Sequence, residues 1–141
     1  MSGTTIEISD GPRDLPLCRE AAESAARDMG FVGEDLYDIV TAVFEASVNA
    51  FTHGCVGTDE PATVTIYTHP DRFEAIIRDH GKGFQCPTDA PIPPAIVRRG
   101  RGIPLMKALM DEVYFEYDNG CKVTLMKRLP VSPLCIPESD V

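Results

Sequence analysis

Three polar residues recur at every fourth position near the end of one predicted helix: Glu45, Asn49 and His53, in EASVNAFTHG. Residues four apart lie on adjacent turns of one helix face, so a carboxylate, a carboxamide and an imidazole share a stripe. This stripe is either a solvated surface or the wall of a ligand site. The small side chains of Ala42 and Ala46 flank the pair and leave room for a ligand. Asn and His are also weaker helix formers than the residues that usually fill an exposed face.

A second candidate feature is DHGKGF, which runs from Asp79 to Phe84 directly after a predicted strand. Gly81 and Gly83, one residue apart, permit a tight turn and a close approach of backbone N–H groups to a ligand. Many ordinary turns carry the same pattern, so it indicates a binding loop only in combination with other motifs.

A third feature is RRGRGIPLM, in which Gly100 and Gly102 lead into a predicted helix. Such a junction presents free N–H groups at the positive end of the helix dipole, which is a natural phosphate site. Arg98, Arg99 and Arg101 lie beside it. This basic cluster is either a solvated loop or the holder of an anion.

The composition restricts the class of protein. The chain has 141 residues, 43% of them hydrophobic, which predicts one domain with one core. Its net charge of −9 argues against a general nucleic-acid binder, which needs basic surface. No apolar run approaches the roughly 20 residues of a membrane helix, and the N-terminus lacks the regions of a signal peptide. Five scattered cysteines without a CxxC pair are expected to be reduced thiols. We therefore expect a cytoplasmic protein that does not bind a membrane.

The hydrophobic periodicity predicts an α+β fold, with helices on one face of a mostly antiparallel sheet. The predicted elements of the first half are a strand over residues 4–9, a helix after an N-cap at Asp14 and ended by Gly30, a helix over 34–52, and strands over 62–69 and 73–80. A glycine- and proline-rich stretch follows over 81–102. The second half continues with a helix over 103–113 and a hairpin of strands over 114–118 and 122–129, joined by Asn119-Gly120. The proline-punctuated tail, residues 130–141, is predicted to be irregular.

In this order the three motifs resemble the N, G1 and G2 boxes of the GHKL (histidine-kinase-like) ATPase superfamily. The segments AVFEASVNAFTHG, DHGKGF, GRGIPLMKALMDEV and VTLMKRL are similar to the anti-sigma-factor serine/threonine kinases in particular. The resemblance covers residues 5 to 129. It implies a histidine-kinase-like ATPase domain over residues 1–129, built as a two-layer α/β sandwich of the Bergerat type with a mostly antiparallel mixed sheet.

The resemblance implies that the site binds ATP and Mg²⁺. It makes Asn49 the Mg²⁺ ligand and Glu45 the base that takes a proton from a substrate hydroxyl. It implies that Asp79 accepts a hydrogen bond from the adenine amino group. His53 either caps its helix end or contacts the ligand.

Residues 85–99 match the mobile ATP lid of the family, with Arg98 and then Arg101 as the expected phosphate clamps. One departure is Cys121, which stands where the family has a Thr whose hydroxyl helps to hold the adenine; a thiol is a poorer donor and acceptor. The other residues expected at the nucleotide are Gly81, Gly83, Gly100, Gly102 and Ile103.

Four functional classes remain open for this sequence. The first is a kinase that phosphorylates a Ser or Thr of a small antagonist (anti-anti-sigma-like) protein and sequesters a sigma factor. The second is a nucleotide-dependent binding module of the same fold without phosphotransfer. A histidine-kinase catalytic domain would need a phosphoacceptor helix, and a chaperone or mismatch-repair ATPase would need further domains. The resemblance favours the kinase, acting through proteins rather than direct nucleic-acid contact, and suggests a homodimer.

Overall fold

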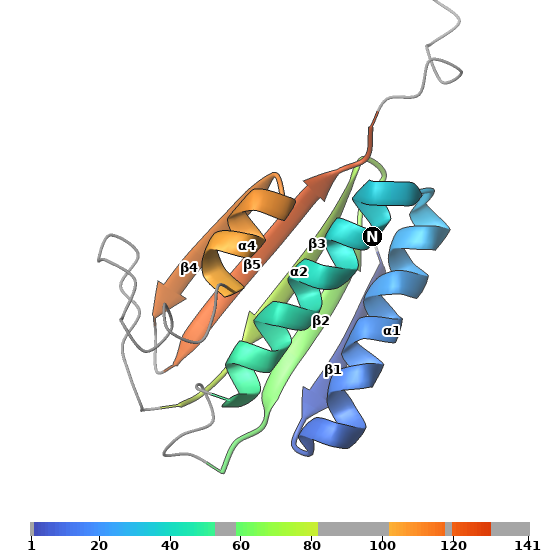
Figure 1. The fold of residues 1–141 in the computed structure, drawn as a ribbon. Coiled ribbons are helices and arrows are strands. Elements are labelled where there is room, and N and C mark those ends of the chain that lie inside the picture. Colours follow the sequence, from blue (N-terminus) through green and yellow to red (C-terminus); the bar gives the residue numbers. More distant parts are fainter. Residues whose placement is uncertain (1, 53–58, 82–101, 118–119, 131–141) are drawn as a thin grey trace, which may run out of the picture.

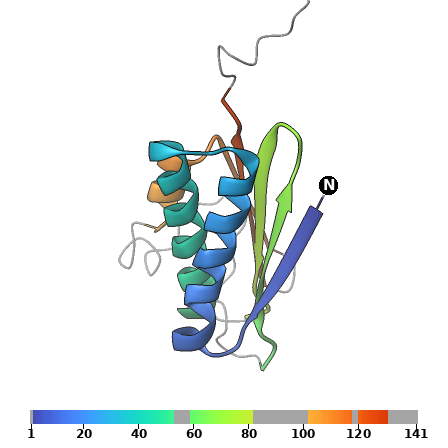
Figure 2. The same cartoon turned by 90° about the vertical axis from the view of Figure 1, so that its right-hand side faces the viewer.

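The computed structural model describes residues 2–52, 59–81, 102–117 and 120–130. Its elements are β1 (Ser2–Ile8), α1 (Gly11–Met29), α2 (Gly33–Thr52), β2 (Ala62–Thr68), β3 (Arg72–Arg78), α4 (Gly102–Leu109), β4 (Glu112–Tyr117) and β5 (Cys121–Arg128). The five strands form one sheet in the order β1-β2-β3-β5-β4, and the three helices pack on one of its faces (Figures 1 and 2). The predicted α+β two-layer fold is confirmed. The prediction allowed for a mixed sheet, but all four strand pairs are antiparallel.

The core lies between the sheet and the helices because each element has one apolar side. In β3, Phe73, Ala75 and Ile77 are buried and alternate with partly exposed residues, which is the period-two pattern of a strand with one covered face. Helix α2 buries residues at a spacing of three and four, which places them on the stripe that faces the sheet. These buried residues of α2 are Leu36, Ile39, Ala42, Val43, Ala46, Ser47 and Ala50.

The N-cap of helix α1 lies four residues earlier in the chain than predicted. The N-cap is Asp10, whose Oδ1 accepts from the Arg13 N–H at 3.0 Å, so the prediction of Asp14 was wrong. The Asp14 carboxylate is buried inside the first turn and accepts from the backbone N–H groups of Ser9 and Asp10, both at 2.9 Å. It therefore ties the β1–α1 connection to the helix. The predicted stop at Gly30 is confirmed by its left-handed backbone, with φ of +105°.

Helix α4 ends earlier than predicted, at Leu109, and Val113 belongs to β4 instead. Two contacts from β5 determine this boundary. The Lys127 ammonium donates to the Leu109 carbonyl at 2.6 Å, and the Asp111 N–H donates to the Met126 carbonyl at 3.0 Å. The first contact satisfies a carbonyl at the helix C-terminus, and the second starts the strand.

The Asp14 carboxylate is expected to make the stability of the fold dependent on acidic pH. A hydrogen bond from Arg13, followed by those from the Asp10 and Ser9 backbone, holds its pKa well below its usual range. A lowered folded-state pKa stabilises the fold above the unfolded value of about 3.9, and this contribution is lost as the pH falls through the folded value. Asp14→Asn should therefore destabilise the protein in urea titrations at pH 7.

The difference in the free energy of unfolding between wild type and Asp14→Asn should be smaller at pH 3, where the wild-type protein has begun to lose the contribution of the charged Asp14 carboxylate. The matched control is Asp28→Asn, an exposed carboxylate on the same helix, which should change the free energy of unfolding little at either pH. An equal Asp14→Asn effect at pH 7 and pH 3 would show that the charge of the carboxylate is not what stabilises the turn.

Candidate functional site

The predicted polar stripe lies on α2, where Glu45 and Asn49 are both half-buried. Their spacing of four places them on adjacent turns of one helix face. The neighbouring Ala42 and Ala46 have exposed fractions of 0% and 2% and belong to the core. The prediction that these small side chains leave room for a ligand beside the pair was therefore wrong, because both alanines are packed in the core. Glu45 and Asn49 form a polar border directly next to packed alanine side chains.

Asp79 follows the last residue of β3 and is held in a fixed position by the backbone. Its side chain is buried, and Oδ1 accepts from the N–H groups of Gly81 and Cys121, both at 3.1 Å. The Asp79 N–H also donates to the Cys121 carbonyl at 2.9 Å. A carboxylate offers about four acceptor positions, so two bonds to one oxygen leave capacity for a ligand donor. The structure thus brings together three predicted site residues: Asp79, Gly81 and Cys121.

Burial raises the pKa of Asp79, and the hydrogen bonds from Cys121 and Gly81 oppose this shift. The charged form is penalised because the carboxylate is removed from water. A ligand that donates a further hydrogen bond to this carboxylate would favour its charged form. The position therefore suits recognition of a neutral N–H donor such as an exocyclic amino group.

Gly120 is a site residue that the sequence analysis missed. It was predicted to lie in a hairpin turn, and the resemblance placed Gly120-Cys121 where the family has Gly-Thr, but no role in the site was predicted for the glycine. In the structure its φ is +128°, and a Cβ atom at this position would lie 2.0 Å from the Asp79 carbonyl oxygen. Only glycine allows the backbone before β5 to approach the end of β3 so closely. The available sequence signal was its place immediately before Cys121, where the family motif has a Gly-Thr pair.

Helix α4 begins at Gly102 and includes Ile103 in its first turn, as the glycine-to-helix junction predicted. Its other end is fixed to α2 by a buried ammonium group. Besides its bond to the α4 carbonyl, the Lys127 Nζ lies 3.8 Å from Asp35 Oδ1 and 3.9 Å from Asp38 Oδ2. These contacts set the position of α4 relative to the helix that carries Glu45 and Asn49.

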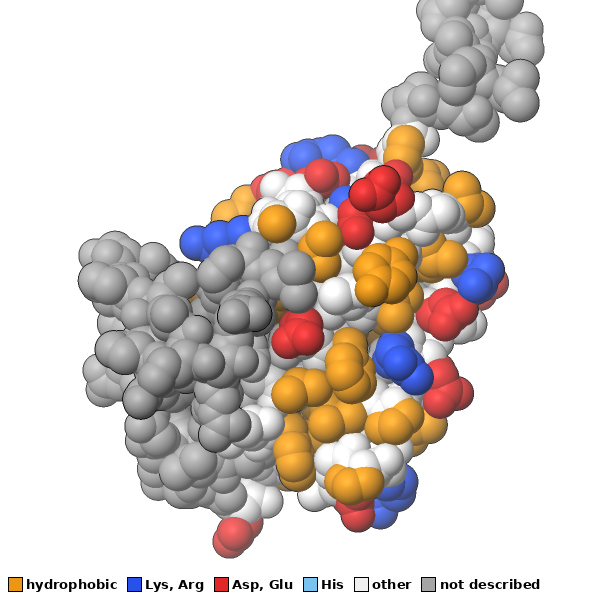
Figure 3. Space-filling view, in the orientation of Figure 1, with side chains coloured by type: hydrophobic (Ala, Val, Ile, Leu, Met, Phe, Trp, Pro, Cys, Tyr) orange, Lys and Arg blue, Asp and Glu red, His pale blue; other side chains and the backbone are white. Residues whose placement is uncertain are grey.

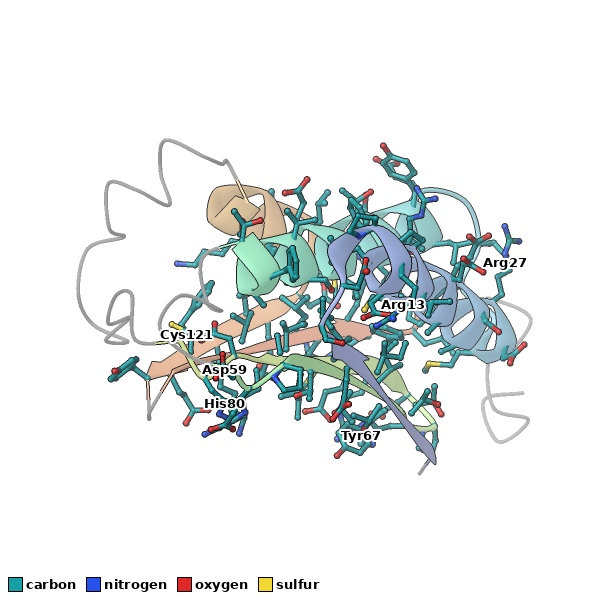
Figure 4. All side chains as sticks on the ribbon, turned by 90° about the horizontal axis from the view of Figure 1, so that it is seen from below. Arg13, Arg27, Asp59, Tyr67, His80 and Cys121 are labelled. Carbon is teal, nitrogen blue, oxygen red and sulfur yellow. The ribbon has the colours of Figure 1, made fainter. Side chains whose placement is uncertain are left out.

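The motifs gather at one end of the molecule. Figure 1 shows the C-terminal end of α2, the end of β3, the start of β5 and the start of α4 at that end. Figure 4 places Cys121 there, at the tip of the sheet. The remaining predicted residues, His53, Gly83, Arg98, Gly100 and Arg101, lie outside the described residues, as does the predicted lid over 85–99.

The arrangement is compatible with the family suggested by the motifs, and the comparison with known families decides the matter. The model of the histidine kinase-like ATPase domain matches residues 8–128, which include all three motifs. The chain belongs to the histidine kinase-like ATPase family. A domain of this family implies ATP binding, and the family prediction made from the sequence is confirmed.

The relatives place the chain among the anti-sigma-factor kinases of this family. It is 31% identical to a serine-protein kinase RsbW of Bacillus pumilus, over 88% of this chain and 84% of the relative. It is 36% identical to an anti-sigma F factor of Clostridium perfringens, over 68% of this chain and 74% of the relative. One of these relatives is thus named as a serine-protein kinase and the other as an anti-sigma F factor.

A solved structure supports the fold. The crystal structure of the RsbU and RsbW domains of a Mycobacterium tuberculosis protein matches with a TM-score of 0.65 and 18% identity. The match covers 92% of this chain and 34% of the larger chain. In the part of the chain that the structure describes, no helix is long and apolar enough to span a membrane.

Proposed function

We propose that this protein is an ATP-dependent serine/threonine kinase that phosphorylates a small antagonist protein and regulates transcription by switching between that antagonist and a sigma factor. The buried Asp79 carboxylate carries this proposal, since its two backbone hydrogen bonds orient it for an adenine amino group. The names of the relatives support the protein substrate and the sigma-factor partner. A cytoplasmic location agrees with such partners.

The residues of α2 would act on the phosphates and on the substrate hydroxyl. Asn49 offers a hard oxygen that suits Mg²⁺, a cation that keeps several waters and binds substrate phosphates in preference to an all-protein cage. Bound there, Mg²⁺ would supply neutralising charge at the phosphates. Glu45, one turn away, is placed to accept the proton of the substrate Ser or Thr.

Backbone groups and arginines would hold the rest of the nucleotide. The N-terminus of α4, at Gly102 and Ile103, presents N–H groups suited to phosphate oxygens. Arg98 and Arg101 are proposed to clamp the terminal phosphate, because guanidinium groups bind phosphoryl oxygens in a bidentate fork. The remaining proposed contacts are His53, Gly81, Gly83, Gly100 and Cys121.

The alternative function is a nucleotide-dependent binding module of the same fold that transfers no phosphate. The half-buried Glu45 favours the kinase, because a binding module has no use for a proton acceptor one turn from the proposed Mg²⁺ ligand. Incubation with radiolabelled ATP and the candidate antagonist tests the choice. Transfer of label supports the kinase, and binding without transfer supports the module.

Asp79→Asn is expected to weaken the binding of both ATP and ADP by at least about tenfold, which corresponds to the roughly 1.5–3 kcal/mol of a hydrogen bond to a charged group. The asparagine oxygen can keep the bonds from Gly81 and Cys121, which turns its NH₂ group toward the adenine amino group. Two donors would then face each other. Isothermal titration calorimetry measures both affinities.

The matched control is Asp71→Asn, an exposed carboxylate in the β2–β3 hairpin at the opposite end of the strands, which should bind both nucleotides as the wild type does. Folded wild-type protein that binds no ATP would remove the basis of the proposed function. An Asp79→Asn protein with unchanged affinity would instead remove only the adenine-reading role of Asp79.

A further inference from the structure

Lys127 is a buried cation that the proposed mechanism does not use. It pairs with the core residue Phe73 in the strand register, so its side chain points from β5 into the layer between sheet and helices. Among the described residues it is the one basic side chain that is buried, with an exposed fraction of 9%. Figure 3 instead shows Lys and Arg side chains at the surface of the helix-bearing face, where water solvates their charge. Burying an ammonium group is costly unless partners compensate for the lost water.

The partners of Lys127 come from two helices. Its Nζ donates to the Leu109 carbonyl oxygen at 2.6 Å, at the C-terminal end of α4. It also lies 3.8 Å from Asp35 Oδ1 and 3.9 Å from Asp38 Oδ2, in the first turns of α2. An ammonium group is favourable at a helix C-terminus because of the helix dipole, and it offsets the repulsion between the two carboxylates. One side chain of β5 therefore connects α4 to α2.

Each of these three elements carries a part of the proposed nucleotide site. Strand β5 begins at Cys121, beside the proposed adenine-binding carboxylate, and α2 carries Glu45 and Asn49 toward its C-terminal end. Helix α4 begins at Gly102, where free N–H groups suit phosphate oxygens. The contacts of Lys127 lie at the other end of each element. Any effect of this residue on the nucleotide must therefore act through the placement of the elements.

The position of α4 depends on such anchors because the helix is short. Its eight residues span about 12 Å, and an isolated helix of this length is not stable in water. The turn after it is joined to β5 by the bonds from the Asp111 N–H to the Met126 carbonyl at 3.0 Å and from the Arg128 N–H to Asp111 Oδ2 at 2.7 Å. A tilt of about 10° about this end would move the phosphate-binding start of the helix by about 2 Å. A displacement of about 1 Å can lower a reaction rate about 100-fold.

We infer that Lys127 is a positioning residue for the phosphate groups of the nucleotide and acts through α4, an inference that rests on the proposed function. Its ammonium group binds the C-terminal carbonyl of α4 and lies between this carbonyl and the carboxylates of α2. The N-terminus of α4 is thereby held at a fixed place relative to Asn49, and both are directed at the same phosphates. An apolar residue of similar size would fill the space without fixing the helix end.

The test is Lys127→Met, which keeps the length of the side chain but removes the ammonium group. The variant leaves no fully buried charge, because the carboxylates of α2 are partly exposed. ATP affinity should fall at least about tenfold, whereas the affinity for adenosine, which has no phosphate, should stay within about threefold of wild type. NMR titrations measure both affinities. Without nucleotide, the backbone amides of α4 should exchange with deuterium at least about tenfold faster. Lys127→Arg keeps a charged donor and should restore ATP affinity to within about threefold.

The matched control is Lys107→Met, which removes the same charge from the exposed surface of α4 itself. Lys107 lies closer to the start of α4 than Leu109 does, so a general loss of attraction for phosphate would affect this variant at least as strongly. It should change both affinities by less than about threefold.

A second disruption of the same contacts is the double variant Asp35→Asn/Asp38→Asn. It should lower the ratio of ATP affinity to adenosine affinity by at least about threefold. Loss of two negative charges would by itself attract ATP more strongly, so a lower ratio reports the position of α4 and not the net charge.

A folded Lys127→Met protein with the wild-type ratio of ATP affinity to adenosine affinity would overturn the inference and leave the proposed function intact, since lower stability alone would then describe the role of the residue. If circular dichroism shows that this variant is unfolded, an unchanged or raised ratio in Asp35→Asn/Asp38→Asn overturns the inference instead. Folded wild-type protein that binds ATP no more tightly than adenosine would remove the proposed function and the inference together.

Discussion

Glu45→Gln is expected to lower the rate of phosphate transfer to the antagonist protein by about 10²–10⁴-fold, the usual contribution of a positioned general base. Glutamine keeps the size of the side chain and cannot accept the hydroxyl proton. ATP affinity should stay close to that of wild type, because the proposed base acts on the attacking hydroxyl and not on the bound nucleotide. Single-turnover transfer of radiolabel measures the rate of phosphate transfer, and calorimetric titration measures the ATP affinity.

The control for this experiment is Glu34→Gln, which removes an exposed carboxylate from the first turn of the same helix. It should transfer phosphate at the wild-type rate. A Glu45→Gln protein with full activity would exclude the residue as the base. If its ATP affinity fell together with its transfer rate, Glu45 would be a binding residue instead.

Gly120→Ala is expected to damage both stability and nucleotide binding. The three atoms nearest to the new methyl group would all belong to the backbone: the Asp79 carbonyl oxygen at 2.0 Å, and the Asp79 carbonyl carbon and the His80 Cα atom at 2.8 Å. None of these can move without displacing the end of β3. We expect a loss of at least about 2 kcal/mol in the free energy of unfolding and at least about 30-fold in ATP affinity.

Gly30→Ala provides a matched comparison, since Gly30 also has a positive φ, +105°, but no atom lies within 4 Å of its added Cβ. This variant reports the cost of the backbone conformation alone, about 1 kcal/mol, and should leave ATP affinity unchanged. Chemical denaturation measures the free energy of unfolding of the two variants, and calorimetry measures their ATP affinity. The comparison separates the cost of the backbone conformation from the effect of the steric clash at Gly120. Equal losses of stability, with ATP binding intact in Gly120→Ala, would contradict a role for Gly120 in the shape of the site.

Local sequence patterns predicted the interiors of the elements better than their ends. Helix α2 was predicted to within one residue because its apolar spacing is regular. The start of α1 was missed because the helix was predicted to follow an N-cap at Asp14, whereas it already includes Pro12 in its first turn. Proline is tolerated in the first turn, where its missing N–H would have no partner in any case. The end of α4 was missed because Lys127 and Met126, which determine it, are 15 or more residues away in the sequence.

The same limit applies to the site. Asp79 was assigned from its place after a strand and before a glycine pair, which is local information. Two features of the site depend on β3 and β5 being neighbours: the hydrogen bond from the Cys121 N–H to Asp79, and the lack of space for a side chain at Gly120. The sequence pattern does not show which strands are neighbours. The small size of Ala42 and Ala46 predicted free space, whereas these residues allow α2 to pack closely on the core. A small side chain beside a polar stripe is consistent both with free space for a ligand and with close packing of the helix on the core.

The site motifs and the β2–β3 hairpin lie at opposite ends of the strands, separated by roughly 20–24 Å for seven residues of β3. The hairpin tip carries exposed Pro70 and Asp71. A biotin attached through Pro70→Cys, in a protein whose Cys55, Cys86 and Cys135 are replaced by Ser and whose Cys18 and Cys121 are buried, would therefore hold the molecule on a sensor chip with its motif-bearing end turned toward the solution. Immobilised in this orientation, the protein presents that end to injected nucleotides and partner proteins alike.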